Sequence, residues 1–197
     1  MIINDLIPVN EYSRSGHLRK ETKAIIIHYV GNPGSSAKAN RDYWASLSAQ
    51  GGIPPKYASA HFVVGLTGEI IRAVPEGEMA YHCGSVIPDP ASGRLYTDWA
   101  QATIGPEYLT QVTSPNQATI GIEMCHPGPD GAFLPITVAR TAFLAASLCL
   151  LYGVDPMTGL GRHWDVVGWK DCPLYYVKNP QAWEEFKRRV AAYMEAS

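Results

Sequence analysis

Ala24-Ile-Ile-Ile-His28 is an uninterrupted apolar run, rich in β-branched residues, that ends in a histidine. Its length and its polar flanks predict a short buried strand. The cluster Gly31-Asn-Pro-Gly34 follows and predicts a turn. Because sites are often built where strands end at the mouth of a sheet, His28 is a candidate site residue. The residues alone leave open that it is a hydrogen-bonded histidine of the core.

Further strands and helices are predicted on both sides of this run. Residues 60–64 and 69–73 flank the turn Gly65-Leu-Thr-Gly68 and predict a hairpin. Residues 119–124 predict another strand, with Glu123 inside an otherwise apolar run. Three helices are predicted: residues 37–50 with Ser35 or Ser36 as N-cap, Thr137 as N-cap to about Tyr152, and Pro180 onward with Asn179 as N-cap. Together these patterns predict an α/β fold with a single mixed β-sheet flanked by helices.

Two segments are less regular. Residues 1–23 are polar and predict an irregular lead-in. Residues 85–115 contain several Gly and Pro, but also the aromatic residues Tyr96, Trp99 and Tyr108, and predict a long ordered insertion. Because loops of this length are usually functional, the insertion is our candidate for substrate selection. For 197 residues we expect one domain, 1–197, with a core over about 24–196.

Composition restricts the class of protein. Hydrophobic residues make up 46% of the chain and charged residues 17%, as in ordinary globular proteins. The net charge is -2 and no basic run occurs, so nucleic acid is not an expected partner. The N-terminus lacks a signal-peptide pattern, and the apolar residues 142–154 predict a buried helix. We therefore expect synthesis in the cytoplasm without a signal peptide and no membrane insertion. The oligomeric state stays open.

The stretch Gly161-Arg-His-Trp-Asp-Val-Val-Gly-Trp-Lys-Asp-Cys-Pro173 brings an imidazole, an ammonium and a thiol together, at His163, Lys170 and Cys172. Its Gly and Pro residues predict a loop. Neutral imidazole and thiolate are both zinc ligands, and a neighbouring cation favours the thiolate of Cys172. The alternative is a surface loop with an incidental histidine and a buried cysteine.

The remaining cysteines and Glu123 each allow two interpretations. No CxxC pair occurs, and Cys149 lies in an apolar run that predicts a core position. The disulfide state of Cys83 and Cys125 stays open. A glutamate is seldom buried without a partner, so Glu123 predicts either a catalytic carboxylate or a salt bridge to an arginine.

Six short pieces occur in one order between about residues 24 and 173: Ile25-Ile-Ile-His28-Tyr, Ala58-Ser-Ala-His61-Phe-Val-Val, Gly68-Glu-Ile-Ile, Ala80-Tyr-His82-Cys-Gly84, Ile120-Gly-Ile-Glu123-Met-Cys, and Arg162-His163-Trp-Asp-Val with Lys170-Asp-Cys172-Pro. In this order they resemble the zinc-dependent N-acetylmuramoyl-L-alanine amidases of the amidase-2 type. That group includes the bacteriophage lysozyme-like amidases and the peptidoglycan recognition proteins.

The resemblance implies a role for each matching residue. His28, His163 and Cys172 would bind one Zn2+ per chain, Glu123 would be the catalytic carboxylate, and Lys170 would lie near the scissile carbonyl. Some relatives carry aspartate in place of the cysteine, and the thiolate here is still consistent with zinc.

Three further positions match residues that line the cleft in the family. His61, Tyr81 and His82 are therefore predicted to contact substrate. Some relatives carry a tyrosine just before the histidine that matches His61. Ala60 stands at that place here, which favours Glu123 as the catalytic group.

By the same resemblance, the reaction would be hydrolysis of the amide between N-acetylmuramic acid and L-alanine in bacterial peptidoglycan or a muropeptide. A phage or prophage endolysin that reaches the cell wall by holin-type release fits this chain better than a cytoplasmic recycling amidase. A non-catalytic peptidoglycan-binding module is the alternative from another class. A structural zinc site is a further alternative, with Asp165 or His126 as fourth ligand. Neither a G-x-S-x-G nor an H-E-x-x-H motif occurs.

Overall fold

The computed structural model describes residues 1–110 and 112–196, and its centre is a six-stranded sheet in the order β1-β4-β3-β5-β2-β6. Gln111, within the predicted insertion, and Ser197, at the end of the predicted domain, lie outside the described residues. All neighbouring strands are parallel except the antiparallel pair β3 and β4. The sheet is therefore mixed, as the sequence predicts. Its strands are β1 Ile2–Asn4, β2 Ala24–Tyr29, β3 Phe62–Val64, β4 Ile70–Arg72, β5 Thr119–Met124 and β6 Leu160–Arg162.

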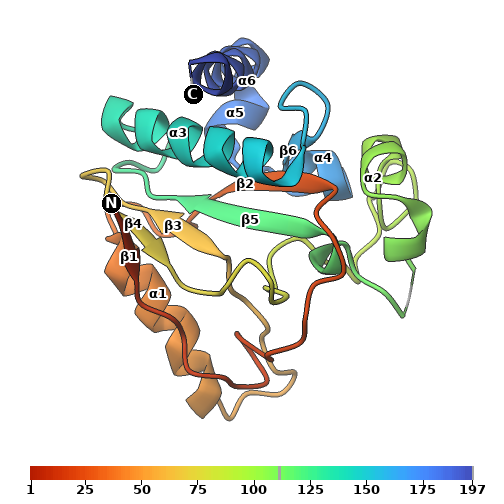
Figure 1. Cartoon of the computed structure of the whole chain (residues 1–197). Coiled ribbons are helices and arrows are strands. Elements are labelled where there is room, and N and C mark those ends of the chain that lie inside the picture. Colours follow the sequence, from red (N-terminus) through yellow and green to blue (C-terminus); the bar gives the residue numbers. More distant parts are fainter. Residues whose placement is uncertain (111, 197) are drawn as a thin grey trace.

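The described residues form six α-helices, of which α2 and α4 lie on the β6 side of the sheet (Figure 1). Helices α3, α5 and α6 lie over one face, and α1 lies against the other. The helices are α1 Ala37–Ser46, α2 Asp98–Thr103, α3 Pro135–Tyr152, α4 His163–Val167, α5 Leu174–Lys178 and α6 Pro180–Glu195, and the 3-10 turns are Leu47–Ala49, Pro106–Tyr108 and Pro115–Gln117.

Alternation along the central strands separates an all-apolar face from a face that also carries polar side chains. Ile25 and Ile27 of β2 pack with Ile120 and Ile122 of β5 beneath α3 and α6. Each of these side chains is fully buried, which stabilises the fold by about 1.5–3 kcal/mol per residue. Because successive side chains point to opposite faces, the residues between them face the other side of the sheet. His28 and Glu123 belong to that other side.

The helix ends follow the predictions in two of three cases. Ser36 Oγ accepts a hydrogen bond from Ala39 N at 3.1 Å and caps α1. Asn179 takes the N-cap position of α6, which begins with Pro180. The predicted cap Thr137 is wrong, because α3 already begins at Pro135. The Thr137 hydroxyl instead donates to Gly65 O at 3.0 Å and ties the helix to the hairpin.

Two short edge strands escaped prediction. β1 pairs in parallel with β4, although residues 1–23 predict only irregular structure. All three of its side chains are exposed, so no burial pattern marks it in the sequence. β6 contains Gly161 and pairs with β2, where a loop is predicted. The indole of Trp99 lies so close to Gly161 that a Cβ there would be 2.3 Å from it.

The predicted insertion at residues 85–115 is attached to the domain by its aromatic side chains. Tyr96 and Tyr108 are buried in a cluster with Ile26 of β2, and the Tyr108 hydroxyl donates to Glu21 Oε1 at 2.7 Å. The segment contains α2, which packs against α4. These tyrosines therefore hold the segment in place, and its role in substrate selection stays a prediction.

Helix α3 is, among the described helices, the one that is long and apolar enough to cross a membrane. Leu144 and Leu148 bury one side of it in the core with Ile122 and Phe186. It is thus a core helix with one face on the sheet, as residues 142–154 predict. All four cysteines are free and buried, which answers the question left open for Cys83 and Cys125.

Candidate metal and catalytic site

The pairing of the two longest strands sets His28 beside Glu123. β2 and β5 run parallel, with His28 opposite Glu123 in the register. Side chains of paired residues point to the same face of a sheet, so the imidazole and the carboxylate share the face opposite α3 and α6. Both residues stand near the carboxyl ends of their strands, where α/β sheets most often form sites.

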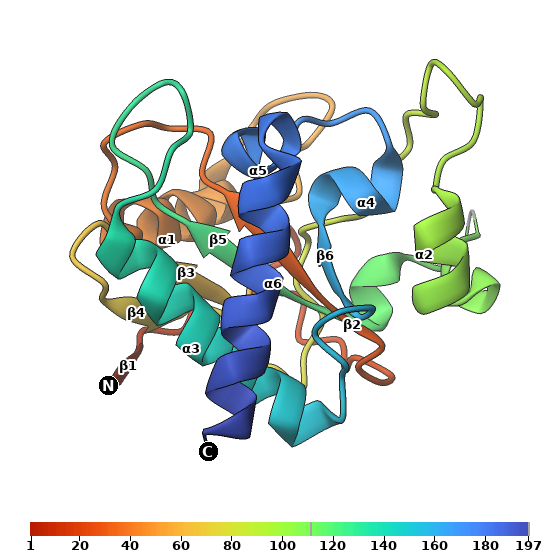
Figure 2. The same ribbon diagram turned by 90° about the horizontal axis from the view of Figure 1, so that it is seen from above.

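His163 arrives from the edge of the sheet, at the first residue of α4. The predicted loop is wrong here, because β6 leads straight into this short helix (Figure 2). Asp165 stabilises the helix start: its Oδ2 accepts from Arg162 N at 2.8 Å and its Oδ1 from Arg162 Nη2 at 2.7 Å. The guanidinium also donates to Tyr176 O at 3.0 Å and lies over the ring of Trp183. Arg162 and Asp165, which we call the brace, therefore fix the junction of β6 and α4 at which His163 lies.

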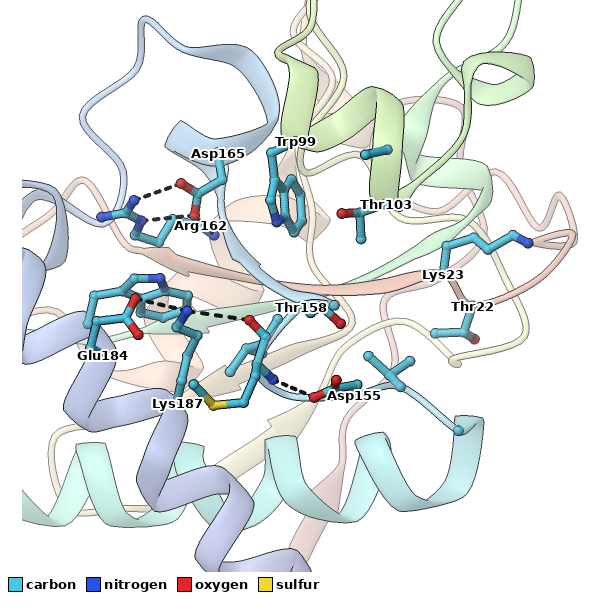
Figure 3. A pocket seen from close by; sticks show the side chains of 17 residues that line it. Thr22, Lys23, Trp99, Thr103, Asp155, Thr158, Arg162, Asp165, Glu184 and Lys187 are labelled. Atoms are coloured by element: carbon cyan, nitrogen blue, oxygen red, sulfur yellow. Dashed lines mark hydrogen bonds and ion pairs between the residues drawn. The ribbon is translucent and has the colours of Figure 1, made fainter.

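The brace lines a cavity of about 840 Å³ along the outer edge of β6 (Figure 3). Arg162 and Asp165 face each other there, and Trp99 and Lys187 stand on its other walls. His28, Glu123, His163, Lys170 and Cys172 do not line it. The cavity is therefore separate from the candidate site.

Asp165→Ala is expected to lower the free energy of unfolding by about 2–3 kcal/mol, because it leaves a largely buried guanidinium without its charged partner. Urea denaturation of the metal-free protein measures this change. The control is Asp98→Ala, which removes an exposed ion pair with Arg94 and should lower the free energy of unfolding far less than Asp165→Ala does. Equal effects of the two substitutions would contradict the brace.

Cys172 reaches the site from the segment after α4. Its backbone oxygen accepts from Trp164 N at 3.0 Å, and its N–H donates to Lys170 O at 2.7 Å. These bonds fold the segment back on α4, so that the buried thiol lies beside His28. Cys172 Sγ is 3.7 Å from His28 Nδ1.

His28, His163 and Cys172 together form a possible metal site. One ligand atom from each lies within 4.8 Å of the other two, and all three residues are buried. Zinc–ligand bonds of about 2.0–2.3 Å at tetrahedral angles separate ligand atoms by about 3.5 Å, close to the distance from His28 to Cys172. His163 Nδ1 is enclosed and has no hydrogen-bond partner in the described part of the chain. The donor set thus fits zinc.

The protonation of these side chains is set mainly by burial. Burial lowers the pKa of His163 to about 3 and that of His28 well below its usual range, so both imidazoles are neutral and keep a lone pair for a metal. Burial also raises the pKa of the Cys172 thiol to about 12. Lys170 favours the thiolate, as the sequence predicts, but burial and the charge of Glu123 outweigh it in the metal-free protein. A metal must displace the thiol proton on binding.

Glu123 lies at the wall of a pocket of about 430 Å³ that reaches α1. Its Oε2 is enclosed without a hydrogen-bond partner, and among the described residues it forms no salt bridge. Burial raises its pKa to about 8, and the nearby charge of Lys170 opposes this shift. Tyr43 and Lys56 line the same pocket, and Lys56 Nζ lies 5.9 Å from the Tyr43 ring centroid. Sequence reasoning missed both, because only tertiary packing brings them to Glu123.

The three predicted substrate contacts lie in different surroundings. His61 is fully buried, and both its nitrogens are used, Nδ1 by Gly121 N and Nε2 by Glu78 O, each at 3.0 Å. This position does not support a substrate contact. Tyr81 is half-buried against Tyr57. His82 turns inward and its Nδ1 lies 3.0 Å from His28 Nε2.

Neither residue considered as a fourth ligand joins the group. The carboxylate of Asp165 is taken up by Arg162. Both ring nitrogens of His126 lie 2.6 Å from backbone oxygens, those of Gly128 and Val30. In the described residues, the metal cluster thus consists of three ligands. Three protein ligands leave one tetrahedral position open, which is the pattern of a catalytic zinc site.

Comparison with known proteins gives a family match. The family model Amidase_2, described as N-acetylmuramoyl-L-alanine amidase, matches residues 18–174. The chain is 35% identical over 191 residues to N-acetylmuramoyl-L-alanine amidase BlyA of Bacillus subtilis (strain 168), covering 97% of this chain and 47% of BlyA. It therefore spans about half the length of the curated relatives it matches.

Solved structures share the fold. The catalytic domain of XlyA is 24% identical with a TM-score of 0.65, over 96% of this chain and 99% of that one. A mutant endolysin from Bacillus subtilis is 23% identical with a TM-score of 0.65, over 96% and 98% of the two chains. At these identities the likeness concerns the arrangement of strands and helices.

Proposed function

The chain belongs to the Amidase_2 family of N-acetylmuramoyl-L-alanine amidases, and on this premise we propose that it hydrolyses the amide between N-acetylmuramic acid and L-alanine in peptidoglycan. The proposal includes one zinc ion, held by His28, His163 and Cys172, and Glu123 as catalytic carboxylate. It rests on one observation above all. Three buried ligands face one another, and an unpartnered carboxylate projects beside them from the neighbouring strand.

The proposed reaction depends on the metal and on two groups of the chain, Glu123 and Lys170. When bound, zinc lowers the pKa of water to about 7 and polarises a carbonyl as a Lewis acid. Glu123 accepts the proton of the attacking water and delivers it to the leaving amine. A carboxylate whose pKa lies near neutrality suits both steps, and burial moves Glu123 into that range. Lys170, exposed at the rim, stabilises the negative charge that develops on the carbonyl oxygen.

The pocket beside Glu123 is the proposed substrate-binding site. Its wall on α1 offers an exposed aromatic ring at Tyr43 and a cation at Lys56. A stem peptide carries free carboxylates, which suit a lysine, and apolar parts, which suit an aromatic ring. These two residues replace His61 as our candidates for substrate contact, whereas Tyr81 stays a prediction.

The biological setting belongs to the same proposal. We propose that residues 1–197 act as a single catalytic domain and that the protein works as a phage or prophage endolysin. It shares its fold with a mutant endolysin from Bacillus subtilis and its family with the amidase BlyA. Synthesis in the cytoplasm and holin-type release to the cell wall follow from that role.

Digestion of purified cell walls tests the function. The protein should release stem peptides with new N-terminal L-alanine, detected by mass spectrometry, while the reducing ends of the glycan stay constant. A chelator should stop the release and added zinc should restore it. Binding to the walls with no new amine in any preparation would favour the non-catalytic binding module. New reducing ends without new amines would contradict an amidase.

A further inference from the structure

His28, the proposed zinc ligand on β2, is the first member of a buried chain of polar contacts. His28 Nε2 lies 3.0 Å from His82 Nδ1, and His82 Nε2 lies 3.1 Å from Thr119 Oγ1. Thr119 Oγ1 in turn lies 2.9 Å from Pro115 O. All the side chains in this row are at most 9% exposed. The row thus runs from the proposed metal site to the backbone carbonyl of Pro115, which can only accept a hydrogen bond.

We propose that His82 and Thr119 are positioning residues that hold His28 in a single tautomer, with the lone pair of Nδ1 facing Cys172. His82 is then not a substrate contact but a support for a metal ligand. This inference rests on the proposed zinc site and goes beyond it, because it assigns a function to two residues outside the ligand set.

The donor and acceptor of each hydrogen bond in this row can be assigned by starting from the carbonyl of Pro115. Two oxygens 2.9 Å apart need a hydrogen between them, and the carbonyl of Pro115 has none, so Thr119 donates. The single hydroxyl hydrogen is then used, so Thr119 must accept from His82 Nε2. A neutral imidazole has one N–H, hence His82 Nδ1 accepts, and His28 Nε2 must donate to it. The lone pair of His28 therefore sits on Nδ1.

This result agrees with the geometry at the metal site. His28 Nδ1 is the nitrogen that lies 3.7 Å from Cys172 Sγ. The same argument requires His82 to be neutral, with its single N–H on Nε2. A ligand histidine whose second N–H is bonded is fixed in both tautomer and ring orientation.

The chain also shows how His82 is held in place. Its backbone N–H and that of Cys83 both donate to Asn116 Oδ1, at 3.2 and 2.9 Å. Its ring packs against Gly121 of β5, where a Cβ would lie 2.6 Å from the imidazole. Glycine weakens a strand interior and often marks a close approach, which here is that of His82. Asn116 thus holds the backbone of His82, and Gly121 leaves space for its ring.

Histidine NMR tests the tautomers directly. Long-range proton–nitrogen spectra of labelled protein distinguish which nitrogen of each of the six histidines carries the proton. We expect the proton on Nε2 of both His28 and His82, in the metal-free and in the zinc-loaded protein. A proton on Nδ1 of His82 would overturn the proposal, whether or not the protein has amidase activity.

Zinc affinity tests the positioning effect. Thr119→Val removes the acceptor of the His82 N–H at constant shape and should weaken zinc binding by about 10–100-fold in competition with a chromophoric chelator. Thr119→Ser keeps the hydroxyl and should retain the wild-type affinity. Thr141→Val is the matched control, because it removes an equally buried hydroxyl that donates to Thr137 O within α3. It should leave the affinity unchanged.

The outcomes separate this inference from the proposed function. Wild-type zinc affinity in Thr119→Val, or the same loss in Thr141→Val, would overturn the positioning role while leaving the amidase intact. Zinc binding that weakens only in Thr119→Val supports it, even before activity is measured. A wild-type protein that binds no zinc would contradict the metal site itself, and the NMR tautomers would still decide the hydrogen-bond chain.

Discussion

Cys172→Ala is expected to abolish tight zinc binding and to lower the release of stem peptides with N-terminal L-alanine by more than about 100-fold. The thiolate is the charged ligand of the proposed set, and its removal leaves two imidazoles to hold a dication. Because the thiol is buried and small, its loss leaves only a minor cavity, and the fold should persist. Zinc content after dialysis and hydrolysis of purified walls measure the two effects.

Cys149→Ala is the matched control for this variant. Cys149 is a buried, free thiol on α3, packed in the apolar cluster on the opposite face of the sheet. The same atoms are removed there, so any general effect of losing a buried thiol appears in both variants. We expect the Cys149 variant to keep its zinc and its activity. Wild-type zinc content in Cys172→Ala would remove Cys172 from the ligand set.

Glu123→Gln is expected to lower the turnover rate by about 10²–10⁴-fold, because the amide keeps the size of the carboxylate but can no longer accept a proton. Zinc content should stay at the wild-type level, since Glu123 lies beside the ligand set and outside it. Single-turnover hydrolysis of a soluble muropeptide at saturating zinc separates the two properties. Loss of zinc together with activity would show that Glu123 acts on the metal site instead of the proton.

The same substitution should make the metal-free protein more stable at high pH. Burial raises the pKa of Glu123 from 4.5 to about 8, so the folded chain binds this proton more tightly than the unfolded chain. Between these values the folded chain carries one proton more, and the free energy of unfolding contributed by this group falls as pH rises. Glutamine has no such titration. The variant should therefore gain stability relative to wild type from pH 4.5 to about 8.

Denaturant unfolding of both metal-free proteins at pH 4 and pH 9 measures that difference. Glu184→Gln serves as the control, because it neutralises an exposed carboxylate on α6 and should leave the pH dependence unchanged. A Glu123 variant that is less stable than wild type at pH 9 would mean that a partner stabilises the carboxylate. A loss of activity combined with a gain in stability is the signature of a catalytic group.

Sequence reasoning was most successful where burial leaves a pattern. Residues 119–124 form β5 as predicted, and residues 24–28 fall within β2. The hairpin of β3 and β4 surrounds the predicted turn. Sequence reasoning failed where the deciding contacts are made by residues far apart along the chain. The three exposed residues of β1 are ordered by backbone pairing with β4, and His163 starts a helix because of Asp165, Arg162 and their neighbours.

The candidate site divides in the same way. The residue types, their order along the chain and the resemblance to the amidase-2 family named the proposed ligands and catalytic groups, and also three substrate contacts. The first set is His28, Glu123, His163, Lys170 and Cys172, and the second is His61, Tyr81 and His82. The structure brings the three predicted ligands together and sets Glu123 beside His28. The pocket residues Tyr43 and Lys56 carry no local signal, since their relation to Glu123 depends on how α1 packs.

The sequence alone determined the fold class and the chemical groups available to the site. Local runs of apolar residues predict the buried strands, and the residue types themselves show which side chains can bind a metal. Tertiary structure decided the electrostatics and the hydrogen-bond roles. The Cys172 thiol is neutral without metal because burial outweighs Lys170, and His82 faces inward because Gly121 leaves it space. Desolvation and the direction of a hydrogen bond depend on what surrounds an atom in three dimensions, and residues distant in the sequence supply those surroundings.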